Sequence, residues 1–335
     1  MKNLAIAGVG AWGKNLLRNF YNLGGGSLVL ACDQDEGRRK WVKATYPGVD
    51  ATADYNDIIK RDDIEAVVIA TPPAAHFEMA MAAIEAGKDV FVEKPLVLSV
   101  TDGEKLVEAA EKANRIVMVG HIMVYHPCTL YLRKQIDDGN LGKIYYLYAS
   151  RVNLGKVRDI ENALWSFAPH DISIILYLLG KDPVRVTSTG SAYLQPGIED
   201  VVFTTLHFGD GTMAHIHVSW LDPHKDRKLV VVGSKKMVEF DDSQAAEKIR
   251  LYDKGVDTKQ DYNTYGEYLA IRTGDIIIPQ IKASEPLAEE CKHFLQCIEK
   301  RERPRSDGVE GLRVLKVLDA AQKSLEAGGA PVSIS

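Results

Sequence analysis

Residues 4–13 read Leu-Ala-Ile-Ala-Gly-Val-Gly-Ala-Trp-Gly, an apolar run that ends in a Gly-x-Gly-x-x-Gly pattern. A helical pattern with Leu16 and Phe20 on one side follows, and a second apolar run, residues 27–32, ends at Asp33. Strand, glycine loop, helix, strand and acid in this order are typical of a dinucleotide-binding βαβ unit. A plain glycine-rich turn would explain the glycines alone, but it would not explain the elements around them.

Each residue type in this loop has a physical task. Gly8 allows the tight turn, Gly10 lets the backbone approach a pyrophosphate, and Gly13 lets the helix pack closely on the strand. The loop continues through Ala11 and Trp12 into the helix. The first N–H groups of that helix and the positive end of its dipole suit phosphate oxygens. We therefore expect the whole loop to bind the cofactor.

Asp33 indicates which cofactor. It lies 20 residues after Gly13, where a carboxylate accepts hydrogen bonds from the adenosine ribose and repels a 2′-phosphate. This predicts NAD in preference to NADP. Arg38 and Arg39 lie close enough in sequence to leave NADP as the alternative.

Strands and helices continue to alternate as far as about residue 122. Short apolar runs predict strands at 64–70, 89–92 and 116–119, and helices are predicted at 76–86 and from a possible capping box at Thr101 and Glu104 to 113. This alternation predicts an α/β fold, a Rossmann-type doubly wound parallel sheet over residues 1–122. Thr71 and Pro72 form the exit turn of the 64–70 strand.

Glu93-Lys94-Pro95 follows the 89–92 strand directly. A lysine just past a buried strand lies at the carboxyl edge of the sheet, where ligands bind in open α/β folds. Pro95 restricts the backbone of Lys94 and so helps to aim its ammonium group. A solvated surface Glu-Lys pair is the alternative explanation.

The pattern changes after residue 122. Residues 123–335 predict an α+β domain with a large open, mostly antiparallel sheet and helices on one face. The expected helices are 127–138, 165–179, 285–300 and 307–327, and the expected strands are 145–152, 184–190, 201–208, 212–220, 228–233 and 237–240. Gly209-Asp210-Gly211 predicts a hairpin, and residues 253–284 are expected to be loop.

Composition excludes several classes of partner. The formal net charge of −5 provides no general attraction to nucleic acid or to an anionic membrane. No apolar stretch approaches the ~20 residues needed to span a bilayer. The four cysteines have no Cys-x-x-Cys spacing, which favours free thiols and a cytoplasmic location.

Polar residues of the second half suggest a substrate site. His170 can take a proton near neutral pH, and a lysine can stabilise negative charge on the same oxygen or act as the base. The cluster Arg151, Asn153 and Lys156 precedes it, and an arginine fork suits phosphate or carboxylate. A backbone-satisfied histidine and a solvated loop are the alternatives.

His207, His215 and His217 fall on the predicted hairpin. A metal site would need further ligands and supporting groups, so a polar sheet face or a subunit interface is favoured and no metal is predicted.

Five motifs together resemble the Gfo/Idh/MocA family of glucose-fructose and myo-inositol type oxidoreductases. They are residues 8–13, Ala70-Thr71-Pro72-Pro73, Glu93-Lys94-Pro95-Leu96, Val119-Gly120-His121, and His170-Asp171-Ile172 with Leu178-Leu179-Gly180. The resemblance covers nearly the whole chain. It implies a Rossmann domain followed by a second domain whose open sheet often forms oligomer contacts, here a homodimer or a homotetramer.

The resemblance also implies roles for residues. Lys94 and His170 match the usual catalytic pair, and Thr71, Pro72, His76, Glu93 and Lys94 fall where the family contacts its cofactor. Many members carry an aspartate four residues before the histidine, where this chain has Ser166. Since serine cannot stabilise an imidazolium as a carboxylate can, Lys94 is expected to carry more of the proton transfer.

The run 151–171, with Arg151, Asn153, Lys156, Trp165 and His170, is most similar to nucleotide-sugar 3-dehydrogenases. This implies oxidation of the 3-hydroxyl of a UDP-N-acetylhexosamine or its uronic acid, with these five residues at the substrate. A myo-inositol or polyol 2-dehydrogenase is the nearest alternative. A non-catalytic dinucleotide-binding regulator and a structural subunit are alternatives of other classes, and the presence of both Lys94 and His170 argues against the regulator.

Overall fold

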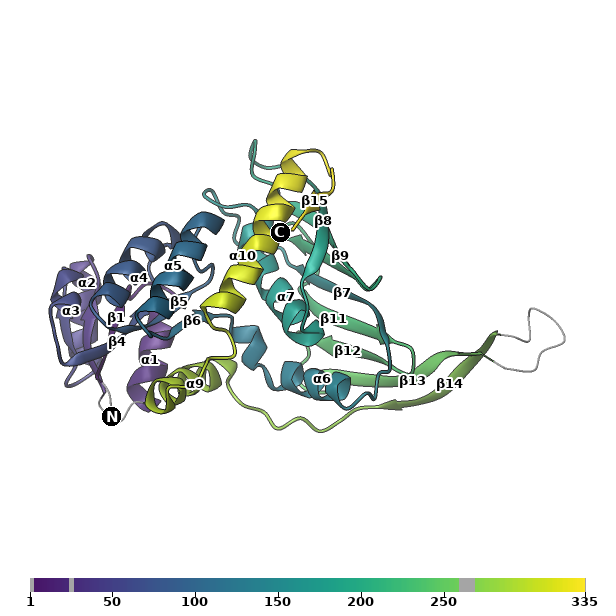
Figure 1. Cartoon of the computed structure of the whole chain (residues 1–335), viewed down its shortest axis with the longest axis horizontal. Coiled ribbons are helices and arrows are strands. Elements are labelled where there is room, and N and C mark those ends of the chain that lie inside the picture. The colour runs from purple at the N-terminus through teal and green to yellow at the C-terminus, as the bar shows by residue number, and fades with distance from the viewer. Residues whose placement is uncertain (1–2, 24–26, 259–268, 335) are drawn as a thin grey trace. The chain divides into compact units, whose positions relative to one another are not determined.

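The computed structural model describes residues 3–23, 27–258 and 269–334 (Figure 1). Two compact units emerge from the pattern of contacts. The first contains Met1–Tyr125 and Ser284–Lys316, and the second contains His126–Ala283 and Val317–Ser335. Residues 24–26, three glycines that are expected to end the first helix, lie outside the described residues.

The first unit is built on a six-stranded parallel sheet in the order β3-β2-β1-β4-β5-β6. Its strands are buried apolar runs, as expected for a parallel sheet covered on both faces. The strands are β1 (Asn3–Ala7), β2 (Leu28–Cys32), β3 (Asp50–Thr52), β4 (Ile64–Ile69), β5 (Asp89–Glu93) and β6 (Val117–Gly120). This arrangement confirms the predicted Rossmann-type sheet.

Helices cover this sheet and bury their apolar stripes on it. Phe20 of α1, Phe91 of β5 and Phe294 of α9 meet edge to face, with ring centroids 5.6–6.1 Å apart. The helices are α1 (Gly13–Leu23), α2 (Glu36–Thr45), α3 (Asn56–Ile59), α4 (His76–Glu85), α5 (Val100–Lys112), α9 (Pro286–Lys300) and the 3₁₀ turns η1 (Pro73–Ala75) and η2 (Ile122–Tyr125).

The second unit is built on a nine-stranded sheet in the order β14-β13-β12-β11-β7-β10-β9-β8-β15. β7 and β10 pair in parallel and the other neighbours pair antiparallel, which confirms the mostly antiparallel sheet. The strands are β7 (Ile144–Val152), β8 (Pro183–Ser191), β9 (Val201–Phe208), β10 (Met213–Ser219), β11 (Asp226–Gly233), β12 (Met237–Asp241), β13 (Ile249–Thr258), β14 (Leu269–Ile277) and β15 (Val332–Ser333).

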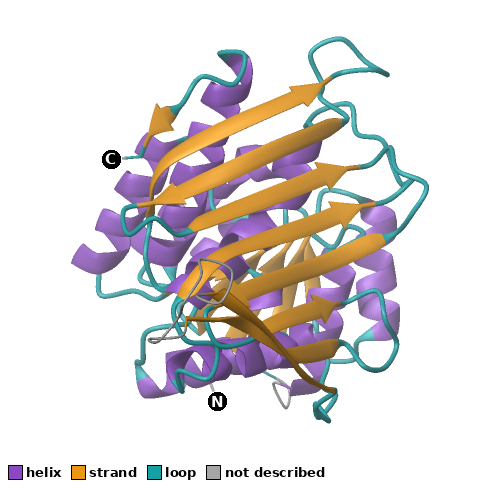
Figure 2. Ribbon diagram, turned by 90° about the vertical axis from the view of Figure 1, so that its right-hand side faces the viewer, coloured by secondary structure: helices purple, strands orange, loops and turns teal. Residues whose placement is uncertain are grey.

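One face of this sheet is covered by helix α7 (Ala163–Leu179), which contacts β7, β9 and β10 and also packs on α6 (Pro127–Asp137). Figure 2 shows the other face with no helix in front of it. Four large side chains of β7, β9 and β10 are exposed: Tyr146, Tyr148, Phe203 and Met213. Helix α10 (Gly308–Glu326) begins in the first unit and ends in the second.

The structure corrects three local predictions. Residues 253–284 are not all loop, because β13 and β14 pair as antiparallel strands. Helix α5 begins at Val100 rather than at a Thr101 capping box, because Ser99 is the N-cap and accepts a hydrogen bond from the Asp102 N–H. The helix predicted from residue 165 begins two residues earlier, at Ala163, so His170 lies inside α7.

The predicted boundary between two domains at residue 122 stays a prediction. The compact units add that α9, although close to the C-terminus, belongs with the Rossmann sheet through its contacts with α1 and η2.

Candidate active site

The glycine loop between β1 and α1 approaches β4 so closely that side chains are excluded. Gly8 has φ +90°, and a Cβ there would lie 2.6 Å from the carbonyl oxygen of Ala70. A Cβ on Gly13 would lie 2.0 Å from the carbonyl oxygen of Gly8. At Gly10, by contrast, the nearest atom to such a Cβ is Nη1 of Arg38, 3.7 Å away. The loop is therefore closed against the sheet and open on its Gly10 side, as a bound pyrophosphate requires.

A pocket of about 970 Å³ lies beside this loop at the carboxyl ends of β1, β2, β3 and β4. Gly8, Gly10, Asp33, Thr71 and Pro72 line it, all of them residues that the sequence assigns to the cofactor. Its size and position at the carboxyl edge fit half of a dinucleotide. Ala11, Trp12, Gly13, His76, Glu93 and Lys94 lie in the same unit but outside the lining of this pocket.

Asp33 is held as a carboxylate at the tip of β2. Its Oδ2 accepts a hydrogen bond from the Val9 N–H at 2.7 Å, and its Oδ1 accepts one from the Asp35 N–H at 2.9 Å. Nη1 of Arg38 lies 3.3 Å from Oδ2. Burial by itself raises the pKa of Asp33, but these three donors outweigh it and hold the pKa below its ordinary value. Asp33 therefore offers a permanent acceptor for ribose hydroxyls.

Arg38 and Arg39, which left NADP as the alternative cofactor, both contact the turn after β2. Arg38 pairs with the Asp33 carboxylate, and Nη1 of Arg39 donates to the carbonyl oxygens of Asp33 and Gln34 at 2.8 Å and 2.7 Å. Both guanidinium groups thus stabilise the loop after β2.

His76 connects two loops at the carboxyl edge. It is fully buried at the start of α4, with Nδ1 2.9 Å from the carbonyl oxygen of Pro95 and Nε2 2.9 Å from that of Thr71. Burial lowers the pKa of His76. The histidine therefore fixes the Thr71 turn against the turn that follows Lys94.

Glu93 ends β5 and contacts the glycine loop. Nε1 of Trp12 donates to its Oε1 at 2.5 Å, and the Lys94 N–H donates to its Oε2 at 3.2 Å. Desolvation raises the pKa of Glu93 to about 7, against the opposing effect of these donors and of the Lys94 charge. His121 is buried nearby, and burial and the Lys94 charge lower its pKa to about 3. Burial therefore shifts both Glu93 and His121 toward their neutral forms.

In the second unit, the residues predicted to contact substrate separate into two groups. Nε and Nη2 of Arg151 donate to Asp171 at 2.8 Å and 2.9 Å, a buried bidentate pair that ties β7 to α7 beside His170. Nε1 of Trp165 donates to Gln322 at 3.1 Å. Asn153 and Lys156 lie on the loop after β7, where Lys156 is exposed. Sequence analysis missed the Arg151–Asp171 pair because its partners lie 20 residues apart.

The three hairpin histidines lie on β9 and β10. Phe203 stacks on His217 with ring centroids 4.4 Å apart, and Nδ1 of His215 lies 3.1 Å from Oγ1 of Thr205. Within residues 3–23, 27–258 and 269–334, no group of three or more potential ligands could hold a metal ion. In the same ranges, no helix is long and apolar enough to cross a membrane.

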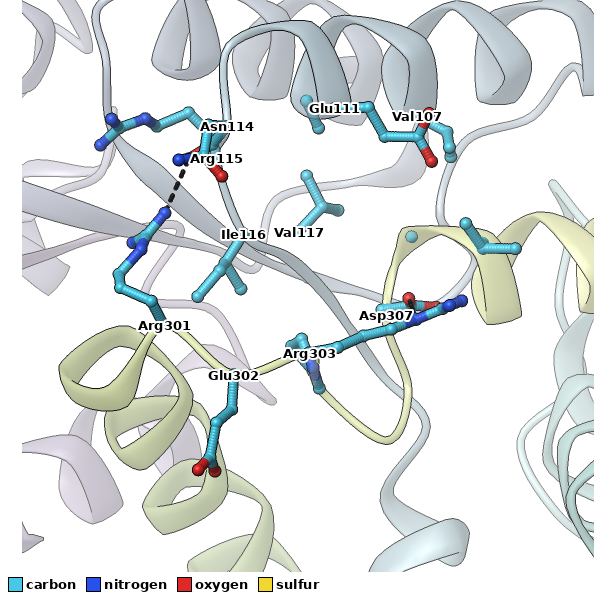
Figure 3. A pocket seen from close by; sticks show the side chains of 14 residues that line it. Val107, Glu111, Asn114, Arg115, Ile116, Val117, Arg301, Glu302, Arg303 and Asp307 are labelled. Atoms are coloured by element: carbon cyan, nitrogen blue, oxygen red, sulfur yellow. Dashed lines mark hydrogen bonds and ion pairs between the residues drawn. The ribbon is translucent and has the colours of Figure 1, made fainter.

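A second cavity, of about 370 Å³, lies at the amino end of β6, between α5 and the segment joining α9 to α10 (Figure 3). Arg115, Arg301 and Arg303 line it. Arg301 bonds Asp89 and the Asn114 carbonyl, Arg303 pairs with Asp307, and Arg115 donates to the Gly87 carbonyl. These arginines join the elements around the cavity, which lies at the edge of the sheet opposite the glycine loop.

Several known proteins are similar to this chain. It is 28% identical to the 2,7-anhydro-N-acetylneuraminate hydratase of Mediterraneibacter gnavus, over 71% of this chain and 66% of that one. It is 33% identical to the inositol 2-dehydrogenase of Klebsiella pneumoniae, over 53% of this chain and 55% of that one. The alignments thus span between about half and two thirds of these relatives. A solved UDP-N-acetylglucosamine 3-dehydrogenase of Acidithiobacillus ferrooxidans has the same fold, with a TM-score of 0.84, 23% identity and 98% of each chain covered.

Two family models match the chain in succession. Residues 2–121 match an oxidoreductase family with an NAD-binding Rossmann fold, and residues 129–239 match the GFO/IDH/MocA C-terminal domain. These are the two sheets described above, with the closed glycine loop and the Asp33 carboxylate in the first. The chain therefore belongs to the Gfo/Idh/MocA family of NAD-binding oxidoreductases.

Proposed function

We propose that this protein is an NAD-dependent dehydrogenase that oxidises a secondary hydroxyl of a sugar. The observation that carries the proposal is the position of Lys94, which follows β5 at the carboxyl edge while Trp12 joins the glycine loop to the neighbouring Glu93. Bound NAD supplies the hydride acceptor. The C–H bond of the substrate gives up its hydride, the O–H bond gives up its proton to a base, and a ketone remains.

Within this proposal Lys94 acts as a neutral amine that accepts the hydroxyl proton, and His170 donates a hydrogen bond to the same oxygen. The carboxylate next to His170, that of Asp171, is already bonded by both forked nitrogens of Arg151. Ser166 stands where a carboxylate would orient the imidazole. Both facts support giving Lys94 the main share of the proton transfer, and they make Arg151 a residue that positions α7. Asn153, Lys156 and Trp165 stay our candidates for substrate contact.

The proposed substrate is a UDP-N-acetylhexosamine or its uronic acid, oxidised at the 3-hydroxyl. Support comes from the run 151–171 and from a fold shared with a UDP-N-acetylglucosamine 3-dehydrogenase. A specific observation favours a second candidate, a polyol 2-dehydrogenase, because an inositol 2-dehydrogenase is 33% identical over 184 residues.

A direct test follows the near-ultraviolet absorbance of NADH. The purified protein is mixed with NAD and, separately, UDP-N-acetylglucosamine, UDP-N-acetylglucosaminuronate or myo-inositol. A rise with one nucleotide sugar alone would support the proposed substrate. A rise with myo-inositol alone would replace it with the polyol. Silence with all three, in protein shown to bind NAD, would contradict both substrates and favour a regulator that does not turn over.

Assembly and location are further parts of the proposal. The exposed side chains Tyr146, Tyr148, Phe203 and Met213 support a homodimer or homotetramer formed through the second sheet. The four cysteines are buried and free, which supports a location in a reducing compartment, the cytoplasm. Light scattering of the native protein and of a Phe203→Lys variant tests the assembly, since a charge on that face should dissociate it.

A further inference from the structure

Asp200 is a buried carboxylate of the second unit that the proposed reaction does not use. It directly precedes β9, which begins at Val201, and it is 0% exposed. Its Oδ2 accepts hydrogen bonds from the N–H groups of Tyr193 and Leu194 at 2.7 Å and 2.9 Å, and its Oδ1 accepts one from Nε1 of Trp220 at 2.5 Å. A buried carboxylate is tolerated when it is hydrogen-bonded in this way, and each of these bonds is strengthened by its charge.

Asp200 lies at an end of the second sheet where β7, β8, β9, β10 and β11 each begin or end. The register of the strands places their terminal residues in one row: Val152, Ser191, Val201, Ser219 and Asp226. Three loops leave this row, residues 153–162, 192–200 and 220–225. Because neighbouring strands lie only about 5 Å apart, these loops emerge side by side.

Hydrogen bonds connect the loop after β7 to Asp200 through the end of β10. The Asp200 carbonyl oxygen accepts a hydrogen bond from Oγ of Ser219 at 3.0 Å and one from the Trp220 N–H at 3.3 Å. The carbonyl oxygens of the same two residues accept hydrogen bonds from the N–H groups of Asn153 and Gly155 at 3.1 Å and 3.2 Å. The beginning of the 153–162 loop is therefore fixed to residues that Asp200 itself binds.

The start of α7 is bonded to the residue before Asp200. The carbonyl oxygen of Glu199 accepts a hydrogen bond from the Ala163 N–H at 2.9 Å, and its Oε2 accepts one from Nδ2 of Asn162 at 2.7 Å. Asn162 is the N-cap of α7 and accepts a hydrogen bond from the Trp165 N–H at 3.2 Å. The end of the 153–162 loop and the first turn of α7 are therefore also fixed beside Asp200.

The candidate substrate contacts Asn153, Lys156 and Trp165 all lie on the two segments that these hydrogen bonds fix. We propose that Asp200 is a positioning residue that holds the 153–162 loop and the start of α7 in place for the sugar substrate. It acts through Trp220 and its own backbone neighbours, and not by contact with the reacting hydroxyl. The inference rests on the proposed function, because that function assigns the three residues to the substrate.

The first test separates the binding of the substrate from its oxidation. Asp200→Asn keeps the shape of the side chain, but its amide nitrogen must face either the Trp220 indole or the two backbone N–H groups, donor against donor. For the sugar that the native enzyme oxidises, we expect KM to rise about tenfold, while kcat and the KM of NAD change less than about twofold. A KM for the sugar that stays at the native value would overturn the proposal.

Thr204→Val is the matched control for a general loss of stability. Thr204 is buried inside β9, and its Oγ1 lies 2.8 Å from Oγ of Ser188 on β8. We expect this variant to melt at a lower temperature than the native protein, as Asp200→Asn does, but to keep the native KM for the sugar. An equal rise of KM in both variants would show that lost stability alone is responsible, and Asp200 would then have no positioning role.

Trp220→Phe is a milder change to the same set of hydrogen bonds. It removes the indole donor to Asp200 but keeps a ring beside Phe167 of α7, whose centroid lies 6.4 Å from that of Trp220. We expect KM for the sugar to rise about threefold. Asp200→Asn/Trp220→Phe should have about the KM of Asp200→Asn alone, because both changes break one network. A KM that multiplies the two separate increases would contradict an action of Asp200 through Trp220.

Limited digestion with trypsin gives a readout that needs no substrate. Trypsin cleaves after lysine and arginine, and Lys156 and Arg158 are exposed in the 153–162 loop. Mass spectrometry of the fragments should show cleavage there about tenfold faster in Asp200→Asn than in the native protein or in Thr204→Val. Equal rates in all three proteins would overturn the proposal. Native protein that oxidises none of the sugars tested would contradict the proposed function, and the digestion would still decide whether Asp200 holds the loop.

Discussion

Asp33 and Glu93 are two carboxyl groups at the same edge of one parallel sheet, and their environments are opposite. Asp33 accepts two backbone N–H groups and faces Arg38, so its pKa lies below the ordinary value. Glu93 has the Trp12 indole and one backbone N–H, and desolvation raises its pKa to about 7. Both groups accept hydrogen bonds, but only Asp33 has enough donors to outweigh burial.

This difference gives the edge of the sheet two ends with different electrostatic properties. The Asp33 end is a fixed acceptor whose charge does not depend on pH near neutrality, which suits the recognition of ribose hydroxyls. The Glu93 end can gain or lose a proton near neutral pH, which suits the place where a hydride and a proton move in the proposed reaction. The glycine loop contacts both ends, through the Val9 N–H on one side and the Trp12 indole on the other.

The largest effect is expected from a substitution next to Glu93 that leaves the Asp33 end unchanged. Lys94→Ala removes the proposed acid–base group, and we expect turnover to fall by about 10³-fold while NAD still binds at the intact Asp33 end. Steady-state kinetics and calorimetry on the same preparation measure the two effects. Lys112→Ala, an exposed lysine of the same unit, is the control and should turn over normally. Normal turnover of Lys94→Ala would remove Lys94 from the mechanism.

The next effect comes from breaking the loop between the two ends. Gly8→Ala introduces a Cβ 2.6 Å from the Ala70 carbonyl oxygen at a positive φ, and we expect affinity for NAD to fall about 100-fold. Gly48→Ala is a matched control, because Gly48 has a similar φ of +86° but no atom within 4 Å of the added Cβ. Backbone strain is common to both variants, so equal losses of affinity would contradict the close approach at Gly8.

An element of the fold could be predicted from the sequence where its signal lies within its own residues. The buried strands β1, β2, β4 and β5 were predictable because continuous apolar runs suit a sheet covered on both faces. β13 and β14 were missed because they carry Asp253, Lys254, Gly255 and Gly274 within them, residues with weak strand preference. Their pairing with each other, and of β13 with β12, outweighs that preference.

The residues of the candidate site also divide into those with a local signal in the sequence and those without one. The glycine loop and Asp33 were predictable from spacing, since the motif is contiguous. The hydrogen bond from Trp12 to Glu93 was not predictable, because it joins two residues that are 81 positions apart in the sequence.

A smaller effect is expected from weakening the Asp33 end. Asp33→Asn keeps the shape of the side chain but loses the charge that pairs with Arg38, so affinity for NAD should fall about tenfold and the preference over NADP should narrow. Because the pKa of Asp33 lies below its ordinary value, the native preference should persist as the pH falls to about 5. Glu36→Gln on the exposed face of α2 is the control, and an unchanged NAD/NADP ratio in Asp33→Asn would separate Asp33 from the ribose.

The smallest effect sharpens the comparison by changing Glu93 through its neighbour. Trp12→Phe removes the indole donor that lowers the pKa of Glu93, so that pKa should rise above about 7.

The pH dependence of the free energy of unfolding tests the contrast between Asp33 and Glu93 without bound cofactor. The pKa of Glu93 is raised above its value of 4.5 in the unfolded chain, so the folded protein binds more protons between these two values. The free energy of unfolding should therefore decrease as the pH rises through this window, and the decrease should extend to higher pH in Trp12→Phe. Thermal melts of both proteins across this range, with Trp41→Phe as the control, measure the shift. A Trp12→Phe profile that overlays the native one would mean that donors do not set the charge of Glu93, and the contrast with Asp33 would then rest on burial alone.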